Sequence, residues 1–292
     1  MRVFVTGATG FIGKAVVKEL IANGHDVLGM ARSDEGARAL AAGGAQVHRG
    51  SLEDLSSLRS GAERADAVIH LAFIHEFSRF QENCAIDKRA IEALGSVLTG
   101  SDRPLIVTAG TAATAASGQL STEDLQLPPD SPFPRVSEQT ALGLKEVSAA
   151  VMRLPQVHDT FRQGLVSYAI QVARDKGVSA YVGDGLNRWP AVHLDDAAIL
   201  YRLALEKHQA GARYHAVAEE GVSVREIAQV IGKGLHVPVK SITADQAPAH
   251  FGWLSLFAGF DSPASSALTR QRLGWHPSGP GLIADLERMN YG

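Results

Sequence analysis

The segment that opens the chain constrains its fold more than any other. Arg2 to Val5 read as a buried strand, and three glycines, Gly7, Gly10 and Gly13, follow with the spacing G-x-x-G-x-x-G. From Phe11 to Leu20, apolar residues recur at helical spacing. A glycine turn that starts after a strand and opens a helix is typical of folds that bind dinucleotide phosphates.

Each glycine of this turn has its own expected role. Gly7 permits the tight turn, Gly10 lets the backbone approach the pyrophosphate, and Gly13 lets the helix pack closely on the strand. The helix N–H groups and the positive end of its dipole then face the phosphates. The neighbouring residues that we expect to line the cofactor are Thr9, Phe11 and Ile12.

Composition narrows the class of protein. The chain has 292 residues, enough for one large α/β domain or a domain with an appended lobe. A net charge of −3 without a basic run argues against nucleic acid and anionic membranes, and no apolar run reaches the length of a membrane span. The single cysteine, Cys84, excludes an internal disulfide, and a strand at residue 2 leaves no room for a signal peptide. We therefore expect a cytoplasmic protein with no nucleic-acid or membrane partner.

Strands alternate with helices through the first half of the chain. Further strands are expected at residues 26–30, 45–48, 66–71, 104–107 and 147–153. This alternation predicts a doubly wound α/β fold with a parallel sheet. Because it weakens after residue 154, we expect a Rossmann domain over 1–154, with last elements returning around 187–206, and a mostly substrate-binding lobe over 155–292. One mixed apolar helix is expected over 245–260, and Asp195 or Asp196 is expected to cap the helix that ends at Glu206.

The end of the second strand predicts the cofactor. NAD-selective sites carry an Asp or Glu here, which bonds the ribose hydroxyls. This chain has Met30 and Ala31, followed by Arg32 and Ser33. Arg32 can pair with a ribose 2′-phosphate and Ser33 can add a hydroxyl, so we expect NADP rather than NAD. Asp34 is expected to cap the next helix.

Three segments together resemble a known family. They are Thr6-Gly-Ala-Thr-Gly-Phe-Ile-Gly13, Val68-Ile-His-Leu-Ala72 and Trp189-Pro-Ala-Val-His-Leu-Asp-Asp-Ala197. They are similar to the extended short-chain dehydrogenase/reductases, the epimerase/dehydratase-like branch, and the resemblance covers essentially the whole chain. Members often pair through a helix bundle, so the resemblance is compatible with a homodimer.

The resemblance also implies which residues line the cofactor. Ser51 and Leu52 would lie by the adenine, although the family usually has Asp where Ser51 sits. Pro155 and Val157 would sit close to the nicotinamide. The other implied positions are Leu71, Ala72, Phe73 and Thr108.

A catalytic hydroxyl is implied at the end of the fifth strand. The family places a Ser or Thr there, which polarises the substrate carbonyl or positions the alcohol. Thr111 or Thr108 can take this part, and we favour Thr111. The stretch from Thr111 to Pro134 is long and irregular, as in a lid or a site wall.

The family's Tyr-x-x-x-Lys pair is missing. Alignment on the aromatic residue places Phe133 and Ser137 at the two positions, and alignment on the Ser-Glu pair places Pro134 and Glu138 there. Phe cannot carry a proton and Glu cannot act as a cation, so the usual acid/base device is absent.

Another residue can take its role, or the substrate or water can supply the proton. His75 lies in the loop after the fourth strand, where ligands bind in this fold, and its side chain titrates near neutrality. His158 lies in the loop after the sixth strand, and Tyr168 is nearby. Arg135 can bind a carboxylate through its planar fork, or pair with Glu138.

These features predict an NADPH-dependent oxidoreductase that reduces a small carbonyl compound, or oxidises the alcohol. The alternatives are an epimerase or dehydratase that keeps its cofactor, and a catalytically silent NADP-binding sensor. The expected partner is a small-molecule substrate, and no metal site is expected.

Overall fold

A parallel sheet forms the centre of the molecule. The computed structural model describes residues 1–111, 115–126 and 134–292. Within these residues, seven strands form one sheet in the order β10-β6-β5-β4-β1-β2-β3, and all neighbours are parallel. The strands are β1 (Arg2–Thr6), β2 (Asp26–Ala31), β3 (Gln46–Arg49), β4 (Ala67–His70), β5 (Ser101–Gly110), β6 (Val147–Leu154) and β10 (Arg213–His215). The doubly wound parallel fold expected from the sequence is confirmed.

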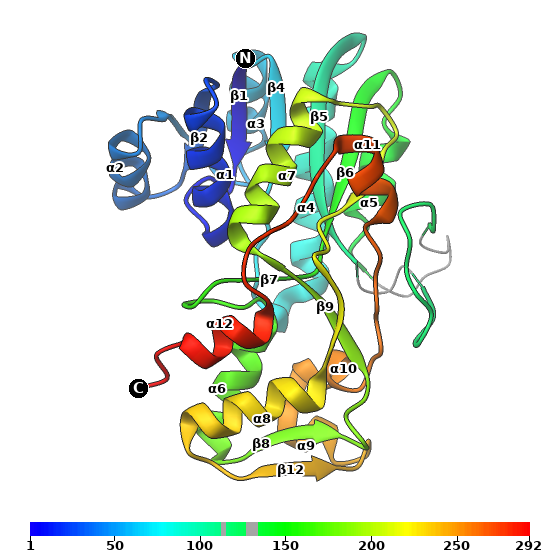
Figure 1. Ribbon diagram of the computed structural model, residues 1–292. Helices are drawn as coiled ribbons and strands as arrows, with labels where there is room; N and C mark the ends of the chain where they lie inside the picture. Colours follow the sequence, from blue (N-terminus) through cyan, green and yellow to red (C-terminus); the bar gives the residue numbers. More distant parts are fainter. Residues whose placement is uncertain (112–114, 127–133) are drawn as a thin grey trace.

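Alternation along the strands explains the two helical layers (Figure 1). In β1, Val3 and Val5 belong to the apolar cluster under α1 and α7, whereas Phe4 belongs to the cluster under α3 and α4. Successive side chains of a strand point to opposite faces, so an all-apolar strand is covered on both sides. The helices around the sheet are α1 (Phe11–Ala22), α2 (Asp34–Ala42), α3 (Leu55–Glu63), α4 (Phe80–Leu98), α5 (Ser137–Gly143) and α7 (Leu194–Glu206).

The strand order places a crevice beside β1. The chain proceeds outward from β1 through β2 to β3, and on the other side from β4 through β5 to β6. The order therefore reverses between β1 and β4. Ligands of open α/β sheets bind at this point, outside the carboxyl ends of the strands.

A smaller group of elements lies beyond that edge, in the lower part of Figure 1. β7 (Gln156–His158), β9 (Arg188–His193) and β11 (Glu219–Ser223) form a three-stranded sheet, and β8 (Ser179–Val182) pairs with β12 (Val239–Ile242). The helical segments that follow β6 in this part are α6 (Val166–Lys176), α8 (Val224–Leu235), α9 (Ala247–Phe251), η2 (Gly252–Leu254), α10 (Ser255–Ala258) and α12 (Leu282–Arg288). Helix α11 (Ala267–Leu273) lies instead in the upper part of Figure 1, against β10 of the main sheet. A separate apolar cluster joins α6, α8, α9 and α12. We call this group the lobe.

Some elements differ from the expectation. The single helix expected over 245–260 is divided into α9, η2 and α10, because Gly252 has φ +57° and interrupts the helical path. Helix α7 is capped by His193, whose ring accepts a hydrogen bond from the Asp195 N–H at 3.3 Å, so neither aspartate is the cap. Asp196 is buried and accepts from the backbone of Ser278 and Gly279 instead.

A buried arginine joins the sheet to the segment that follows β5. Arg153 in β6 is 0% exposed and binds both oxygens of Glu138, at 2.6 and 2.7 Å. It also donates to the carbonyl groups of Thr122 and Leu125, at 3.3 and 2.6 Å, and to Nε2 of His215. Burial and the neighbouring Arg153 lower the pKa of His215 to about 4, so this ring stays neutral and can accept that bond. The guanidinium therefore has partners on several sides, as a buried charge requires.

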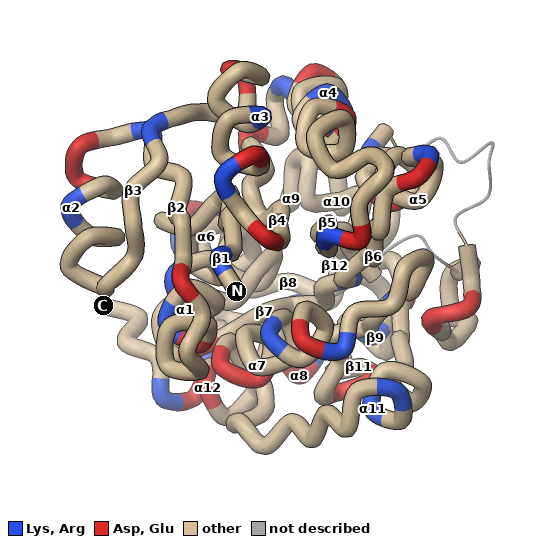
Figure 2. The backbone as a smooth tube through the Cα atoms, turned by 90° about the horizontal axis from the view of Figure 1, so that it is seen from above, with Lys and Arg blue, Asp and Glu red and all other residues tan. Residues whose placement is uncertain are grey.

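The outer helices carry charges of both signs. Figure 2 shows basic and acidic residues interleaved along α4, among others. Of the helices in the described ranges, none has the length and apolar character needed to cross a membrane.

Candidate functional site

The glycine turn lies against the loop that follows β4. Gly7 has φ +69°, and a Cβ at this position would lie 2.7 Å from the backbone nitrogen of Ala72 and 3.0 Å from the carbonyl carbon of Leu71. A Cβ on Gly13 would lie 2.0 Å from the Gly7 carbonyl oxygen. Both positions therefore require glycine, for a left-handed turn and for close helix packing. The turn has the shape expected of a phosphate cradle.

The first turn of α1 supplies the hydrogen-bond donors. Gly10 is the N-cap and has no side chain to satisfy the N–H groups of Phe11 and Ile12. Unsatisfied N–H groups at a helix N-terminus favour an anion. These features, together with the cradle, fit the pyrophosphate of a dinucleotide.

An arginine that the sequence did not predict lies at the same turn. Arg162 is exposed, and its guanidinium carbon is 6.0 Å from the ring centre of Phe11. It lines a cleft of about 540 Å³ whose other walls include Gly10 and Lys14 of the turn and helix α1, and Asp159 of the loop after β7. Three cations (Lys14, Lys18 and Arg162) line this cleft beside the donors of α1. The chain therefore offers both N–H groups and positive charge to a pyrophosphate.

The residues predicted to select NADP lie at the start of α2. Arg32 is exposed, and Ser33 is the N-cap of this helix, since its hydroxyl accepts from the Gly36 N–H at 3.1 Å. The cap is therefore Ser33 and not Asp34. Arg49, at the end of β3, donates to the Ser33 carbonyl at 2.6 Å and to Asp34 at 2.8 Å. Two arginines thus lie near the position where a 2′-phosphate was expected.

The residues expected by the adenine lie further along this edge. Ser51 is half-buried, and its hydroxyl accepts from the Asp54 N–H at 3.3 Å. Leu52 is buried in the cluster under α3. The predicted assignment of both to the adenine stays a prediction.

A buried chain of polar groups underlies the carboxyl ends of β1 and β4. Thr6 accepts from the Ala72 N–H at 3.3 Å and lies 2.9 Å from Nδ1 of His70, whose Nε2 lies 3.1 Å from Asp87. Burial raises the pKa of Asp87, but the bonds and charges of His70 and its other neighbours outweigh it and lower the pKa overall. An ionised Asp87 only accepts, so His70 Nε2–H donates to it and Nδ1 accepts the Thr6 hydroxyl proton. Ser137 donates to the second oxygen of Asp87 at 2.5 Å.

Arg135 lies above this chain, between the ends of β4 and β5. Its Nε donates to the Ser137 hydroxyl at 3.0 Å and a terminal nitrogen donates to the Thr108 carbonyl at 3.2 Å. Its guanidinium carbon is 4.1 Å from the ring centre of Phe73, a cation–π arrangement. Burial lowers the pKa of Arg135, but a guanidinium is so basic that the side chain remains a cation.

His75 faces two arginines. The side chain is open to solvent, and its ring centre is 5.2 Å from that of Phe73. Partial removal from water, then the charges of Arg135 and Arg162, lower the pKa of His75 below its usual value. The structure therefore brings together His75, Arg135, Phe73 and the glycine turn with its Arg162, as a cofactor and substrate site requires.

The two candidate threonines are both buried. Thr108 is 7% exposed, and its hydroxyl is 2.7 Å from the hydroxyl of Tyr201, whose pKa burial raises. Thr111 is 4% exposed, and its N–H and hydroxyl are directed at the Leu154 carbonyl, at 3.1 and 3.5 Å. Thr111 directly follows the carboxyl end of β5, and its catalytic role stays a prediction.

His158 has a structural environment. It is 0% exposed, and its Nδ1 is 2.7 Å from Asp285 of α12, which is also buried. His193 packs on it with ring centres 5.8 Å apart. This histidine joins β7 to α12 and is enclosed, so the structure does not bring it to His75 and Arg135. Pro155 is half-buried, and Val157, directly before His158 in the chain, is buried.

The segment that lacks Tyr and Lys has other partners. Phe133 lies outside the described residues, and Pro134 opens the next described stretch. Ser137 belongs to the Asp87 chain. Glu138 pairs with Arg153 and, at 2.7 Å, with Arg213, so it is not the partner of Arg135.

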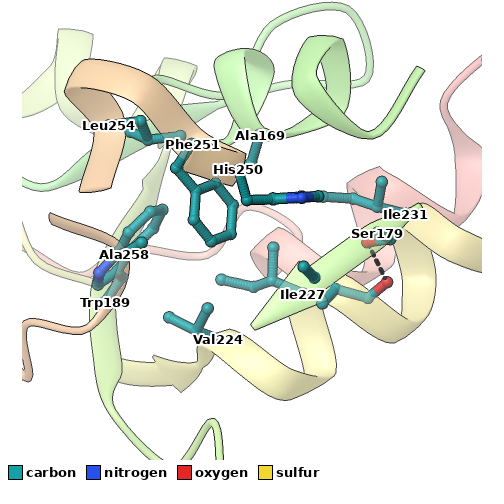
Figure 3. A pocket seen from close by; sticks show the side chains of 12 residues that line it. Ala169, Ser179, Trp189, Val224, Ile227, Ile231, His250, Phe251, Leu254 and Ala258 are labelled. Carbon is teal, nitrogen blue, oxygen red and sulfur yellow. Dashed lines mark hydrogen bonds between the residues drawn. The ribbon is translucent and has the colours of Figure 1, made fainter. Parts of the chain in front are cut away.

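The core of the lobe has no room for a substrate. Figure 3 shows its small cavity, of about 20 Å³, with the rings of His250, Phe251 and Trp189 around it and the Ser179–Ala228 hydrogen bond on one side. This volume holds about one water molecule. This cavity is therefore too small to hold an organic substrate.

Comparison with known proteins agrees with this geometry. The model of the NAD dependent epimerase/dehydratase family matches residues 3–218. The chain is 50% identical to the uncharacterized protein C2A9.02 of Schizosaccharomyces pombe, with all of both chains covered. It is 28% identical to the decarboxylating sterol-4-alpha-carboxylate 3-dehydrogenase of Dictyostelium discoideum, over 77% of this chain and 74% of that one.

A solved structure shows the same fold. DesIV, a dTDP-glucose 4,6-dehydratase from Streptomyces venezuelae with NAD and TYD bound, superposes with a TM-score of 0.76 at 19% identity, over 99% of this chain and 96% of that one. The seven-stranded sheet, the glycine cradle and the family match over most of the chain lead to one conclusion. The chain belongs to the NAD dependent epimerase/dehydratase family.

Proposed function

We propose that this protein is an NADP(H)-dependent oxidoreductase that reduces the carbonyl group of a small molecule, or oxidises the corresponding alcohol. One observation carries the proposal: His75 and Arg135 meet at Phe73, directly after the strand whose loop touches the glycine turn. A cationic donor and a titratable ring thus face the same space at the sheet edge where a cofactor of this fold presents its reactive end.

The chain's own groups can hold the cofactor. The N–H groups of α1 and the cation of Arg162 suit the pyrophosphate. Arg32, with Arg49 beside Ser33, suits the 2′-phosphate, where a carboxylate would have favoured NAD. When bound in reduced form, the cofactor supplies a hydride to the carbonyl carbon.

The residues of the crevice have defined parts in the reduction. Arg135 draws electron density toward the carbonyl oxygen as the carbon–oxygen double bond opens. Thr111 orients that oxygen. His75, when protonated, gives its proton to the developing alkoxide, which becomes the alcohol. In the reverse direction, neutral His75 takes the proton from the alcohol, which suits a histidine with a lowered pKa.

A second candidate is a silent NADP-binding sensor. The observation that favours it is the loss of Tyr and Lys, whose positions are taken by groups bonded to Asp87 or to Arg153. The family also contains epimerases and dehydratases, in which a retained cofactor ends each cycle unchanged. Net consumption of NADPH separates the reductase from both alternatives.

The cofactor assignment is tested by titration with NADPH and NADH. Arg32→Ala is expected to weaken NADPH binding about tenfold and to leave NADH unchanged, because one charge-assisted contact to the 2′-phosphate is lost. Arg38→Ala, at an exposed position of helix α2 just after Arg32, removes an equal charge and is the matched control. Equal affinity of the wild type for both cofactors contradicts the assignment.

Turnover is tested with NADPH and a panel of aldehydes and ketones, by absorbance of the reduced nicotinamide. We expect NADPH consumption in the wild type. His75→Gln is expected to lower its rate by at least about 10²-fold, the lower end of what a general acid contributes. Thr111→Val is expected to lower kcat with little change in NADPH affinity. Tight NADPH binding without consumption across the panel rejects the reductase and favours the sensor.

A further inference from the structure

A line of aromatic rings runs from the loop after β4 to the lobe. We call it the aromatic wall; its members are Phe73, Phe77, Phe80, Tyr168, Trp253 and Phe257. The first three follow β4, and the last three belong to α6, η2 and α10 of the lobe. Their side chains therefore connect the edge of the main sheet with the lobe.

The wall is held by close ring contacts. Phe77 lies flat on Trp253, with ring centres 3.7 Å apart and planes 10° apart. Tyr168 meets both rings edge-on, at 5.7 and 5.0 Å. The two edge-to-face pairs of Tyr168 are of the favourable kind, and together with the face-to-face pair they fix the orientation of the rings.

The wall differs from the aromatic core of the protein. The buried aromatic side chains are each 6% exposed or less: Phe4, Trp189, Tyr201, Tyr214, Phe251 and Trp275. No member of the wall is buried to that degree, and Tyr168 is 37% exposed. Partly exposed rings that gather in one place mark a binding surface more often than a packed core.

The polar end of the wall is the proposed reaction site. Phe73 carries Arg135 on its face and His75 at its edge. From there the rings lead away from the sheet toward Trp253 in η2. A ligand that extends along the wall therefore has its polar group at Arg135 and its apolar body against the rings.

We propose that the aromatic wall binds a flat aromatic ring of the substrate, so that the substrate is an aldehyde or ketone that carries such a ring a short distance from its carbonyl. This inference rests on the proposed reductase function and adds the substrate class to it. Ring faces already fixed in stacking orientation favour a flat, polarisable partner over a saturated ring of equal size, since the puckered ring cannot stack.

A matched pair of substrates tests the proposal. 3-Phenylpropanal and 3-cyclohexylpropanal have the same carbon skeleton, and neither ring is conjugated with the carbonyl. We expect kcat/KM to be about tenfold higher for the phenyl compound, because one or two aromatic ring pairs stabilise a complex by about this factor. Equal kcat/KM for the two compounds overturns the proposal.

Two variants test whether the aromatic wall causes the preference for the phenyl compound. Trp253→Leu keeps an apolar side chain but removes the ring, and is expected to bring the ratio of kcat/KM values close to one. Leu256→Ala is the matched control, because Leu256 is 77% exposed on the same part of the lobe and is not a member of the wall. A ratio that Trp253→Leu leaves unchanged overturns the proposal, provided that the thermal midpoint of the variant matches the wild type.

A binding assay keeps this test independent of turnover. The chain has three tryptophans, of which Trp189 and Trp275 are 4% and 1% exposed, so quenching by a small ligand reports on Trp253. We expect 3-phenylpropan-1-ol to quench the fluorescence of the NADP-loaded protein at concentrations where 3-cyclohexylpropan-1-ol does not. Quenching by the phenyl alcohol without any turnover rejects the proposed reductase function but supports the ring-binding site. Turnover without ring preference and without quenching supports the reductase function but rejects the ring-binding site.

Discussion

One pair of variants can measure how much the close contact between the glycine turn and the β4 loop contributes to stability and to NADPH binding. Gly7→Ala places a Cβ 2.7 Å from the Ala72 backbone nitrogen, at φ +69°. Gly24→Ala places one at φ +80°, with nothing within 4 Å. Both changes cost the left-handed strain of roughly 1–2 kcal/mol, and only Gly7→Ala adds overpacking of roughly 1–3 kcal/mol. We expect losses in the free energy of unfolding of about 2–5 kcal/mol for Gly7→Ala and about 1–2 kcal/mol for Gly24→Ala.

The assay is urea unfolding followed by circular dichroism, with NADPH titration of the folded proteins. Gly7→Ala is also expected to weaken NADPH binding at least about tenfold, because the turn must move away from Ala72 and its N–H groups lose their alignment. Gly24→Ala leaves binding unchanged, since Gly24 lies after α1 at its far end. The reasoning is refuted if both variants lose the same stability and bind NADPH equally.

Two further predictions concern titratable side chains. Carbonyl reduction needs protonated His75, so its rate is expected to fall as pH rises through the pKa of His75, which lies below the usual value for histidine. Arg162→Gln removes a cation that disfavours the protonated ring, so the descending limb of the kcat profile should move to higher pH; a limb that stays in place contradicts the coupling. Asp285→Ala leaves buried His158 without its Nδ1 partner and is expected to lower the free energy of unfolding by about 2–3 kcal/mol, measured in urea. Glu287→Ala on the exposed side of the same helix should change it by less than about 0.5 kcal/mol, and an equal loss in both would contradict the role of the His158 pair.

The sequence predicts those parts of the molecule that local patterns determine. The turn of Gly7 and Gly13 could be predicted because its glycines have fixed spacing and each answers a local steric demand. The end of α6 at Gly177 and the start of α8 after Ser223 have similarly local causes, namely a left-handed cap and a hydroxyl cap. The cap of α2 was misassigned because Ser33 and Asp34 are adjacent and both are good caps, and only the backbone path distinguishes them.

The rest of the site depends on contacts between distant parts of the chain. Arg162 reaches the glycine turn from a loop about 150 residues later, and no local spacing signals this. In the sequence, nothing distinguishes Asp87 from other acidic residues of helices. Its role follows only from the fold, because β4 places His70 within hydrogen-bond distance of it. The three-residue spacing of Arg135 and Glu138 suits an ion pair within one helix turn. In the structure, Arg153 from a neighbouring strand pairs with the Glu138 carboxylate instead. Tertiary partners decide such cases, and local propensity does not.

The guanidinium of Arg153 also affects the order in which the chain can assemble during synthesis. Residues 115–126 leave β5 and are held by Arg153 of β6 through the carbonyls of Thr122 and Leu125. Their other backbone partners come much later in the chain, since the Ser121 N–H donates to the Pro263 carbonyl at 2.9 Å. Domains tend to fold from the N-terminus as they emerge from the ribosome. The first strands of the sheet can therefore pair while this segment still lacks its second anchor, which is synthesised only after about nine tenths of the chain.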